Sequence, residues 1–582
     1  MLSLPAPLKR LLAGVALTLL AVLAIQCLHL TPQFVLTRNL MLQQDLPVLV
    51  LTCALLLAIA WWGLPAALAG RAEKWAGGFA AAQPRAVSLV ILGAGVIAAL
   101  GTRFVALDFA ISRDEMMALF DAEIFGSGRL LAPVAPEWRP FVPALHPDFR
   151  LPVPGHVAWV STYLPGNAAV RAVLGKVFNG ALINAIIVMM ALAALHGVAR
   201  RLWPERLDAQ ALAVILAATS SQVLCMAMTP FAMSTHLALN MIWLWLFVRN
   251  TRAGHACCVA TGFLATGLHQ ILFHPLFVAP FIVQLLLERR WRTAGFYIAS
   301  YAAIGVFWIV YWQLLLSGHG IMPEAKAGGG VGVAYFISRV TALLQFFSFY
   351  GLETMAQNLL RFAAWQNPLL LILLVPGVAM AWQLKGVLRS LAAGILLTIV
   401  AMFILLPNQD IGWGYRYVHG LIGGAALLGA QGWIALTAVT GQRALVPLIV
   451  MLTAFSGLIL LPLHAAQMHA HIAPFARAQA AIAKIDAEAV VVETVSAYYG
   501  IDFVRNDPFL RNRPLVFDIG ELDEALTREL CARMRVAMFD GRDAAKFGVQ
   551  YTDPTTHPAW AQMQKVRTLV ESEECRRLLR RR

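Results

Sequence analysis

The amino-acid sequence predicts a mainly α-helical bundle that crosses a membrane about thirteen times and ends in a small α/β domain outside the bilayer. Hydrophobic residues make up 59% of the 582 residues and charged residues only 13%, a balance that excludes an ordinary soluble globular protein. Apolar runs long enough to cross a bilayer recur between residues 11 and 463, whereas roughly the last 110 residues are more polar and alternate strand-like with helix-like patterns.

The length of each apolar run defines the predicted spans, because about 20 apolar residues in a helix cross the hydrocarbon core. The first run follows Lys9 and Arg10 as in a signal peptide, but it is long and lacks a small-x-small cleavage site, so we expect a retained span. The runs on either side of His274 are short and closely spaced, which favours two short or broken helices. The predicted spans are 11–30, 46–69, 87–106, 175–198, 209–228, 232–248, 256–273, 275–288, 294–316, 368–384, 390–407, 417–438 and 444–463.

Short basic loops give these spans one consistent orientation. When the runs are counted in order, all of these loops fall on the same side of the membrane, and basic loops mark the cytoplasm. We therefore expect a multi-pass protein of the bacterial inner (cell) membrane with a cytoplasmic N-terminus. Since these loops account for much of the formal net charge of +14, no nucleic-acid partner is expected. The basic residues are Lys9, Arg10, Arg71, Lys74, Arg85, Arg200, Arg201, Arg206, Arg249, Arg252, Arg289, Arg290, Arg292, Lys385, Arg389 and Arg443.

This orientation places two long loops, about 107–174 and 317–367, and a C-terminal domain on the exported, periplasmic side. The predicted organisation is an N-terminal transmembrane hairpin over 1–85, a transmembrane region over 86–465 that includes both loops, and an extracytoplasmic α/β domain over 466–582 with strands near 489–495, 514–519 and 534–539. Cys531 and Cys575 lie in this domain, where they either form a disulfide, as export permits, or remain separate thiols.

An adjacent acid pair, Asp114 and Glu115, follows the third span at the start of the first exported loop. A carboxylate at a membrane surface can act as a general base toward an acceptor hydroxyl, or can ligate a metal where other oxygen ligands converge. The alternative is a helix N-terminus with Ser112 as its cap, where the helix dipole favours acids in the first turn. The local sequence leaves both interpretations open.

Unusual polar residues gather at the other exported span ends, whereas the cytoplasmic turns carry only basic anchors. Polar side chains at membrane depth are costly, so their convergence indicates a cavity open to the exported side. Arg416 is the best candidate to bind a phosphate, because a guanidinium presents a planar set of donors to phosphoryl oxygens. The gathered residues are His236, His269, Gln270, His274, Trp365, Gln366, Asn367, Asp410, Tyr415, Arg416, Tyr417 and His419.

The first exported loop resembles that of the GT-C class of integral membrane glycosyltransferases, which includes protein O-mannosyltransferases and the aminoarabinose transferases of lipid A. The matching stretches are SRDEMMALFDAEIFGSGRL and STYLPGNAAVRAVLGKVFN, with the Asp114–Glu115 pair, a helix from Ala122 to Gly128, prolines from Pro133 to Pro165, and Arg171. The resemblance implies a GT-C-like transmembrane catalytic region that transfers a sugar from a polyprenyl-phosphate-linked donor to a glycan, lipid or protein acceptor, beside membrane lipid.

The resemblance also implies roles for individual residues. Asp114, with Glu115 beside it, would form the catalytic pair of an inverting transfer, with Asp114 as base. Arg416 would hold the donor phosphate, helped by His269 or His274. A second loop acid would be Glu137 or Asp148. Tyr415, Tyr417, Gln270 and Asp410 complete the predicted substrate-binding set. No cofactor is expected, although a divalent metal is not excluded by the residues.

Two features depart from the class pattern. Two spans precede the acid pair where the class usually has one, so residues 1–85 form an added hairpin of unassigned role, and the Lys-Pro-Pro-like segment that often follows the pair is not evident in EWRPFVPALHPDF. Two other classes of function remain open: a transporter or flippase of a lipid-linked sugar, and a non-catalytic envelope assembly protein. Transporters commonly show paired repeats and ionisable residues at mid-membrane, and neither is evident in the sequence.

Overall fold

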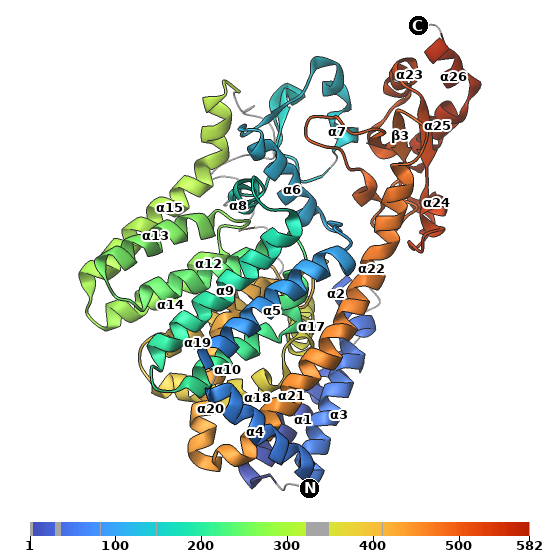
Figure 1. The fold of residues 1–582 in the computed structure, drawn as a ribbon. Coiled ribbons are helices and arrows are strands. Elements are labelled where there is room, and N and C mark those ends of the chain that lie inside the picture. The colour runs from blue at the N-terminus through green and yellow to red at the C-terminus, as the bar shows by residue number, and fades with distance from the viewer. Residues whose placement is uncertain are drawn as a thin grey trace. The chain divides into compact units, whose positions relative to one another are not determined.

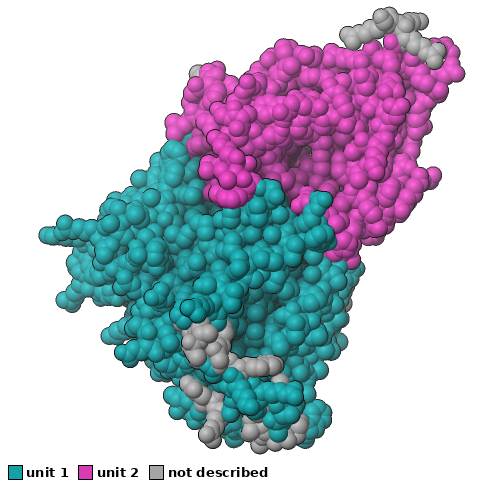
Figure 2. Space-filling model, viewed as in Figure 1, with its two compact units in different colours: residues 1–105, 179–310, 332–468 teal, residues 106–178, 311–331, 469–582 magenta. Residues whose placement is uncertain are grey.

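The computed structural model describes residues 4–28, 36–81, 83–146, 148–321, 341, 349–409 and 411–580. Within them the chain divides into two compact units, shown in Figure 2. Unit 1 comprises residues 1–105, 179–310 and 332–468, and unit 2 comprises residues 106–178, 311–331 and 469–582. Each unit is built from segments far apart in the sequence, so neither is one of the continuous predicted domains.

Unit 1 is helical, and α1 and α3 lie side by side within it (Figure 1). A π-helical turn, η1 (Met41–Asp45), joins α2 to α3. The helices that begin in unit 1 are α1 (Ala6–Leu28), α2 (Leu36–Leu40), α3 (Leu46–Trp62), α4 (Ala66–Ala81), α5 (Gln83–Phe104), α9 (Gly180–Leu202), α10 (Leu207–Ala218), α11 (Ser221–Met226), α12 (Ala232–Phe247), α13 (Arg252–Thr266), α14 (Phe273–Leu287), α15 (Trp291–Gly318), α17 (Phe349–Trp365), α18 (Pro368–Gln383), α19 (Val387–Leu405), η4 (Arg416–Leu421), α20 (Ile422–Thr440), α21 (Gln442–Phe455), η5 (Ser456–Leu460) and α22 (Leu461–Ile482).

Among the described residues, eight helices are long and apolar enough to cross a membrane, or up to nine if α17 and α18 together count as one bent span. Three shorter apolar helices, 207–218, 232–247 and 273–287, also coincide with predicted spans. The prediction of a helical membrane bundle is confirmed, while the total of thirteen spans stays a prediction. The tight pair at 256–288 forms two short helices, α13 and α14, as one alternative anticipated.

The second predicted exported loop, 317–367, is partly helical. Residues Phe349–Trp365 form α17, which packs against α1 and α3 and meets α18 at a bend of 114°, the geometry of a broken span or re-entrant segment. Hydropathy did not reveal α17 because its polar residues lower the average over its length. Residues 322–340 and 342–348 of this loop lie outside the described residues.

Small residues bring α18 and α20 into close contact. A Cβ added to Gly377 would overlap the carbonyl oxygen of Leu428, and one added to Gly432 would overlap that of Leu373. Membrane helices associate through such close backbone approach, because lipid offers no hydrophobic driving force between them. This contact holds the middle of α20, the helix that directly follows the short helix η4 containing Arg416.

Unit 2 combines the first predicted exported loop with the C-terminal segment. The loop contributes α6 (Arg113–Gly126), the antiparallel strands β1 (Ala132–Pro133) and β2 (Ala158–Trp159), the short helices η2 (Pro136–Phe141), α7 (Val142–Leu145) and η3 (Pro154–His156), and α8 (Gly166–Leu174). The C-terminal segment adds β3 (Ala489–Val492), β4 (Leu515–Asp518), β5 (Val536–Phe539), η6 (Gly500–Phe503), η7 (Ile519–Glu521), η8 (Pro554–Thr556), α23 (Glu524–Arg533), α24 (Gly541–Ala545), α25 (Trp560–Glu571) and α26 (Glu573–Arg580).

The three strands form a parallel sheet in the order β4-β3-β5, with Ala489 aligned to Leu515 and to Val536. All residues of β3 and β4 are buried, as expected for a parallel sheet covered on both faces. The predicted strands are confirmed, each slightly shorter than its apolar run. The prediction of a small α/β domain is therefore confirmed as a fold.

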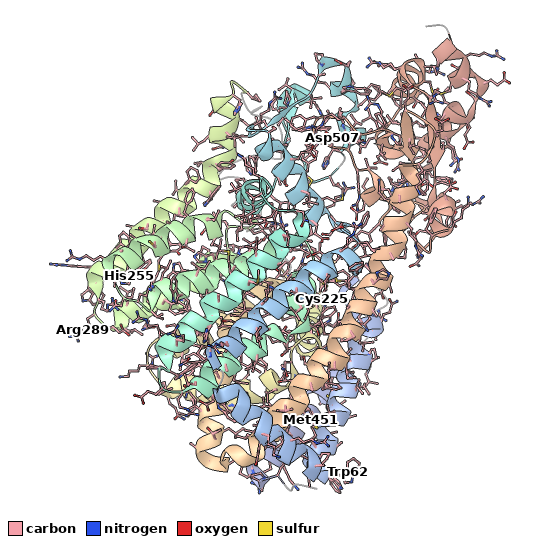
Figure 3. The ribbon with its side chains drawn as sticks, viewed as in Figure 1. Trp62, Cys225, His255, Arg289, Met451 and Asp507 are labelled. Atoms are coloured by element: carbon pink, nitrogen blue, oxygen red, sulfur yellow. A yellow bond between two sulfur atoms is a disulfide. The ribbon has the colours of Figure 1, made fainter. Side chains whose placement is uncertain are left out.

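The loop and the C-terminal segment share one hydrophobic core. Phe141 of the loop packs edge-to-face on Phe517 of β4 with ring centres 5.9 Å apart, and the Trp159 indole donates a hydrogen bond to the Pro508 carbonyl at 2.8 Å. Asp507, labelled in Figure 3, orders the adjoining turn by accepting hydrogen bonds from the amides of residues 509, 511 and 512. The sequence boundaries grouped this loop with the membrane region, and the structure instead packs it with the C-terminal segment.

Cys531 of α23 and Cys575 of α26 form a disulfide, with their Cα atoms 5.0 Å apart. The remaining described cysteines are free thiols, and Cys257 among them is exposed. The bond joins the last helix to the domain across 44 residues of sequence, so the paired alternative is confirmed.

Replacing both Cys531 and Cys575 by serine is expected to destabilise unit 2 by about 2–4 kcal/mol, because the disulfide restricts the unfolded chain. Protease cleavage between residues 523 and 580 of the purified full chain should accelerate. Cys257→Ser is the matched control and should leave the cleavage rate unchanged. Equal cleavage of the double variant and the parent chain would show that the disulfide does not hold α26 in place.

Candidate functional site

The acid pair forms the first turn of α6. The Ser112 hydroxyl accepts a hydrogen bond from the Glu115 amide at 3.4 Å, and the Glu115 carboxylate accepts one in return from the Ser112 amide at 2.9 Å. This reciprocal arrangement is a capping box, which satisfies amides that the first turn of a helix leaves unbonded. The alternative of a capped helix N-terminus is therefore confirmed, and any catalytic role is additional to it.

Glu115 is engaged by this cap. Its side chain is buried, and its Oε2 also accepts a hydrogen bond from the Ile111 amide at 3.1 Å. Burial raises the pKa of the Glu115 carboxyl to about 7, against the opposing effect of the hydrogen bonds from Ser112. The predicted partner of Asp114 thus orients the start of α6 from inside the protein.

Asp114 is the accessible member of the pair. It is half-buried, and its Oδ1 accepts a hydrogen bond from the Tyr163 hydroxyl. Its place in the first turn of α6 also favours a negative charge, because the backbone amides there carry partial positive charge. An accessible carboxylate held in one orientation is the arrangement that a general base requires.

Buried arginines join the start of α6 to the C-terminal segment within unit 2. The Arg113 Nε lies 2.8 Å from Asp502 Oδ1, with both side chains under 10% exposed, and the Arg113 guanidinium also donates to the Ile501 carbonyl. Arg505 donates from Nε to the Asp502 carbonyl at 2.6 Å and lies 4.0 Å from the centre of the Phe109 ring. These contacts fix the residues that precede the acid pair.

Two further positive charges act on the buried Glu115. Burial lowers the pKa of Arg171 to about 10 and that of Arg505 to about 10, and the Glu115 charge opposes the shift at both. Arg171 comes from α8 and Arg505 from the segment after η6. Three parts of the chain therefore supply the cationic surroundings of the capped acid pair.

The second loop acid predicted from the sequence was Glu137 or Asp148, and both side chains are exposed. A buried acid of the same loop is Asp121, whose Oδ1 accepts a hydrogen bond from the Ser161 amide at 3.0 Å. Burial raises the pKa of Asp121 to about 8, so its carboxyl is protonated near neutral pH. Asp121 lies on α6, two turns after Asp114. Its hydrogen bond to the Ser161 amide holds the backbone just before Tyr163.

In unit 1, the predicted phosphate-binding residues lie at the start of η4. Tyr415, Arg416 and Tyr417 are all buried. The Arg416 guanidinium lies 5.6 Å from the centre of the Phe231 ring and 5.3 Å from that of Tyr417, a distance at which aromatic faces stabilise a cation. The structure therefore holds this cation in an aromatic environment inside the membrane unit.

Side chains hold the non-helical backbone that leads to Arg416. The Gln409 amide group donates to the Gly414 carbonyl at 3.1 Å and accepts a hydrogen bond from the Arg416 amide at 3.0 Å. Gln222 donates to the Tyr415 carbonyl at 2.7 Å. Away from bulk water such backbone groups must be satisfied by protein. The backbone at Arg416 is thus oriented by fixed partners.

His274 is part of a hydrogen-bonded cluster. Its Nδ1 lies 2.8 Å from Asn240 Oδ1 and its Nε2 lies 2.8 Å from the Tyr301 hydroxyl. Asn240 in turn donates to the Gly420 carbonyl of η4 at 2.9 Å. Both ring nitrogens of His274 are therefore occupied, and this histidine positions η4 through Asn240.

The other predicted residues of this region differ in accessibility. His269, His236 and His419 are buried, and Gln270 is half-buried. Asp410 lies outside the described residues. Within the described ranges, no group of three or more His, Cys, Asp or Glu side chains is placed to hold a metal ion.

Sequence reasoning missed several residues around the acid pair. Tyr163 lies in the STYLPGN stretch that carried the resemblance, so that stretch could have marked it as a candidate site residue. Arg113 contacts a carbonyl 388 residues further along the chain, and no local pattern marks such a pair. The acid pair lies in unit 2 and Arg416 in unit 1, and their sharing one pocket stays a prediction.

Comparisons with known proteins give structural neighbours only. No family model and no curated protein matches the sequence. Among solved structures, ArnT from Cupriavidus metallidurans bound to undecaprenyl phosphate is similar over 70% of this chain and 83% of its own, with 16% identity and a TM-score of 0.43. The apo oligosaccharyltransferase of Archaeoglobus fulgidus is similar over 65% of this chain and 56% of its own, with 15% identity and a TM-score of 0.38.

Asp121 is expected to make folding stability depend on pH. Between its ordinary pKa of 3.8 and about 8, the folded state retains a proton that the unfolded state has released, so stability falls as pH rises by up to about 1.4 kcal/mol per pH unit. Asp121→Asn keeps an oxygen to accept from Ser161 and removes this titration. Its unfolding midpoint, measured from about pH 5 to about pH 8, should decline less than that of the parent chain.

The control for this measurement is Asp486→Asn, because the Asp486 side chain is 90% exposed. Its stability should follow the parent chain across the pH range. Parallel curves for the parent and Asp121→Asn would show that Asp121 is ionised in the folded state and would contradict the expected shift of its pKa.

Proposed function

We propose that this protein is an inverting glycosyltransferase that moves a sugar from a polyprenyl-phosphate-linked donor to an acceptor hydroxyl at the periplasmic face of a bacterial inner membrane. The observation that carries the proposal is Asp114: a half-buried carboxylate at the N-terminus of α6 that accepts a hydrogen bond from Tyr163 and follows Arg113, which is paired with Asp502. Its neighbour Glu115 stabilises that helix start from within. This division of roles supports Asp114 as the base.

An apolar groove in unit 1 supports a lipid-linked donor. The groove has a volume of about 250 Å³ and lies between α17, α18, α19, η4 and α20, and two of its lining residues, Val418 and Leu421, belong to the same short helix as Arg416. A polyprenyl phosphate combines an apolar chain with an anionic head. An apolar groove lined by the short helix that also carries a buried arginine offers complementary chemistry to both parts of such a molecule.

The proposed reaction is a single displacement. The acceptor oxygen forms a bond to the anomeric carbon while the bond from that carbon to the phosphate oxygen breaks, and the polyprenyl phosphate leaves with the bonding electrons. Asp114 takes the proton of the acceptor hydroxyl, and Arg416 stabilises the charge that develops on the departing phosphate. His269 or His274 would assist Arg416 in this step, and both ring nitrogens of His274 are already hydrogen-bonded.

Asp114→Asn is expected to lower sugar transfer by about 10²–10⁴-fold, because it removes the general base and keeps the side-chain shape. The purified chain, given a radiolabelled polyprenyl-phosphate sugar and the acceptor lipids and glycans of an envelope extract, reports the rate. Asp486→Asn is the control, being an exposed carboxylate of the same unit. Full transfer by Asp114→Asn would remove Asp114 from the mechanism. Translocation of the label across vesicles without a new linkage would indicate a transporter. The absence of both transfer and translocation would indicate a non-catalytic assembly protein.

Arg416→Lys is expected to weaken binding of undecaprenyl phosphate by about ten- to a hundredfold, because an ammonium cannot reproduce the planar donor set of a guanidinium. Binding to the purified protein can be measured in detergent with the labelled lipid phosphate. Arg292→Lys, a change of an exposed arginine, should leave binding unaltered. Unchanged affinity in Arg416→Lys would place the phosphate elsewhere.

A further inference from the structure

A buried ion pair connects the N-terminal hairpin to α17. Asp45 Oδ2 lies 3.7 Å from Arg361 Nη1, and both side chains are fully buried at 0% exposure. Charged side chains within a membrane-embedded bundle are costly and rarely retained without a role. Since Asp45 lies within a candidate span, Arg38–Trp62, this pair requires an explanation beyond packing.

The π-helical turn η1 presents two successive residues to α17. Asp45 Oδ1 accepts a hydrogen bond from the Trp365 indole at 2.7 Å, and Gln44 Oε1 accepts one from Arg361 Nη2 at 3.3 Å. The Trp365 ring is stacked on His464 with ring centres 4.0 Å apart, which fixes the indole that holds Asp45. Turns of this type occur frequently at functional positions.

Arg361, which is paired with Asp45, also holds the backbone that precedes Arg416. Its Nη2 donates to the Gly412 carbonyl at 2.6 Å and its Nε donates to the Gly414 carbonyl at 3.1 Å. Gly414 has a positive φ of 75°, and a Cβ there would lie 2.6 Å from the side chain of Gln222, so only glycine fits this turn. The Gly414 carbonyl also accepts from Gln409, which in turn accepts from the Arg416 amide.

We infer that Asp45 is a positioning residue for the Arg416 segment and that the N-terminal hairpin exists in part to supply it. The negative charge of Asp45 holds the Arg361 guanidinium in the orientation that lets it donate to two carbonyls of residues 411–417. Without that charge, a buried arginine has no fixed counterion, and its hydrogen bonds to the turn loosen. The hairpin, which the resemblance left without a role, then determines how the proposed phosphate-binding residue is presented.

The inference concerns the order of residues 411–417, and only its consequence for substrate rests on the proposed function. The first measurement is therefore amide hydrogen exchange of the purified full chain, which needs no ligand. Asp45→Asn retains an oxygen for the Trp365 indole and removes the charge, and Arg361→Lys retains a charge and removes the two-carbonyl donor geometry. Both variants should exchange the 411–417 amides about tenfold faster, as expected when a buried hydrogen bond is weakened.

Two controls separate this effect from general loosening. Asp208→Asn alters a carboxylate with the same kind of partners, the Trp433 indole at 2.7 Å and Arg206 at 2.8 Å, elsewhere in unit 1. Gln357→Leu removes a hydrogen bond of 3.3 Å to Gln26 of the hairpin, one helical turn before Arg361. Both controls should leave the exchange of 411–417 at the parent rate, and all four variants should retain parent exchange in α9.

A second readout tests the consequence for the ligand. Asp45→Asn and Arg361→Lys should each weaken undecaprenyl phosphate binding by about tenfold, with both controls unchanged. If exchange of 411–417 is unaltered in Asp45→Asn and Arg361→Lys, the inference is wrong. If exchange rises but binding is unaltered in these variants and in Arg416→Lys, the inference stands and the assigned phosphate site is wrong.

The variants of a buried ion pair carry a risk of misfolding, so a milder change completes the test. Trp365→Phe removes the indole donor that holds Asp45 and keeps an aromatic ring against His464. It should raise the exchange of 411–417 by a smaller factor than Asp45→Asn. Two results together would contradict the inference: exchange of 411–417 at the parent rate in a folded Trp365→Phe protein, and loss of folding in both Asp45→Asn and Arg361→Lys. They would show that the Asp45–Arg361 pair acts in global stability alone.

Discussion

The structure of unit 1 depends on one constraint: backbone that is not helical must find hydrogen-bond partners within the protein. Lipid supplies none, and each unpaired group costs several kcal/mol. The chain between α19 and α20 meets this constraint with side chains from three separate helices, α17, α11 and α12. Asn358 donates to the Pro407 carbonyl at 2.7 Å, Arg361 donates to two glycine carbonyls, Gln222 to Tyr415 and Asn240 to Gly420. Polar residues that look out of place in apolar helices are therefore explained by what this segment requires.

The same reasoning explains why sequence predicted the bundle better than the site. Hydropathy located the helices because length and apolarity are local properties, and the strands of unit 2 and the Ser112 cap were equally local. Asp45 and Arg361 lie 316 positions apart in the sequence, and no local pattern near either residue indicates its partner. Polar residues at span ends were recognised as a group, but their individual partners depend on helix packing.

The first exported loop illustrates a second limit of the sequence. Its packing partner was not predicted, because shared burial leaves no signature in a single chain. Phe141 and Trp159 read as loop residues, and in the structure they enter the core that covers β4. Residues 311–331 also belong to unit 2, so this unit draws on three parts of the chain. The C-terminal segment is thus the support on which the acid-bearing loop is built.

In the proposed mechanism, the acid pair serves folding and chemistry together. A capping box needs an acid at the third helical position, and Glu115 occupies it with its side chain turned inward. Asp114 then lies one residue earlier, near the positive end of the helix, where its side chain is half-buried and contacts Tyr163. Because successive helical residues point about 100° apart, the two carboxylates point in different directions, and only that of Asp114 is partly exposed. The motif therefore assigns its two acids different roles through helix geometry, and the fixed position of Glu115 is what gives Asp114 a defined direction.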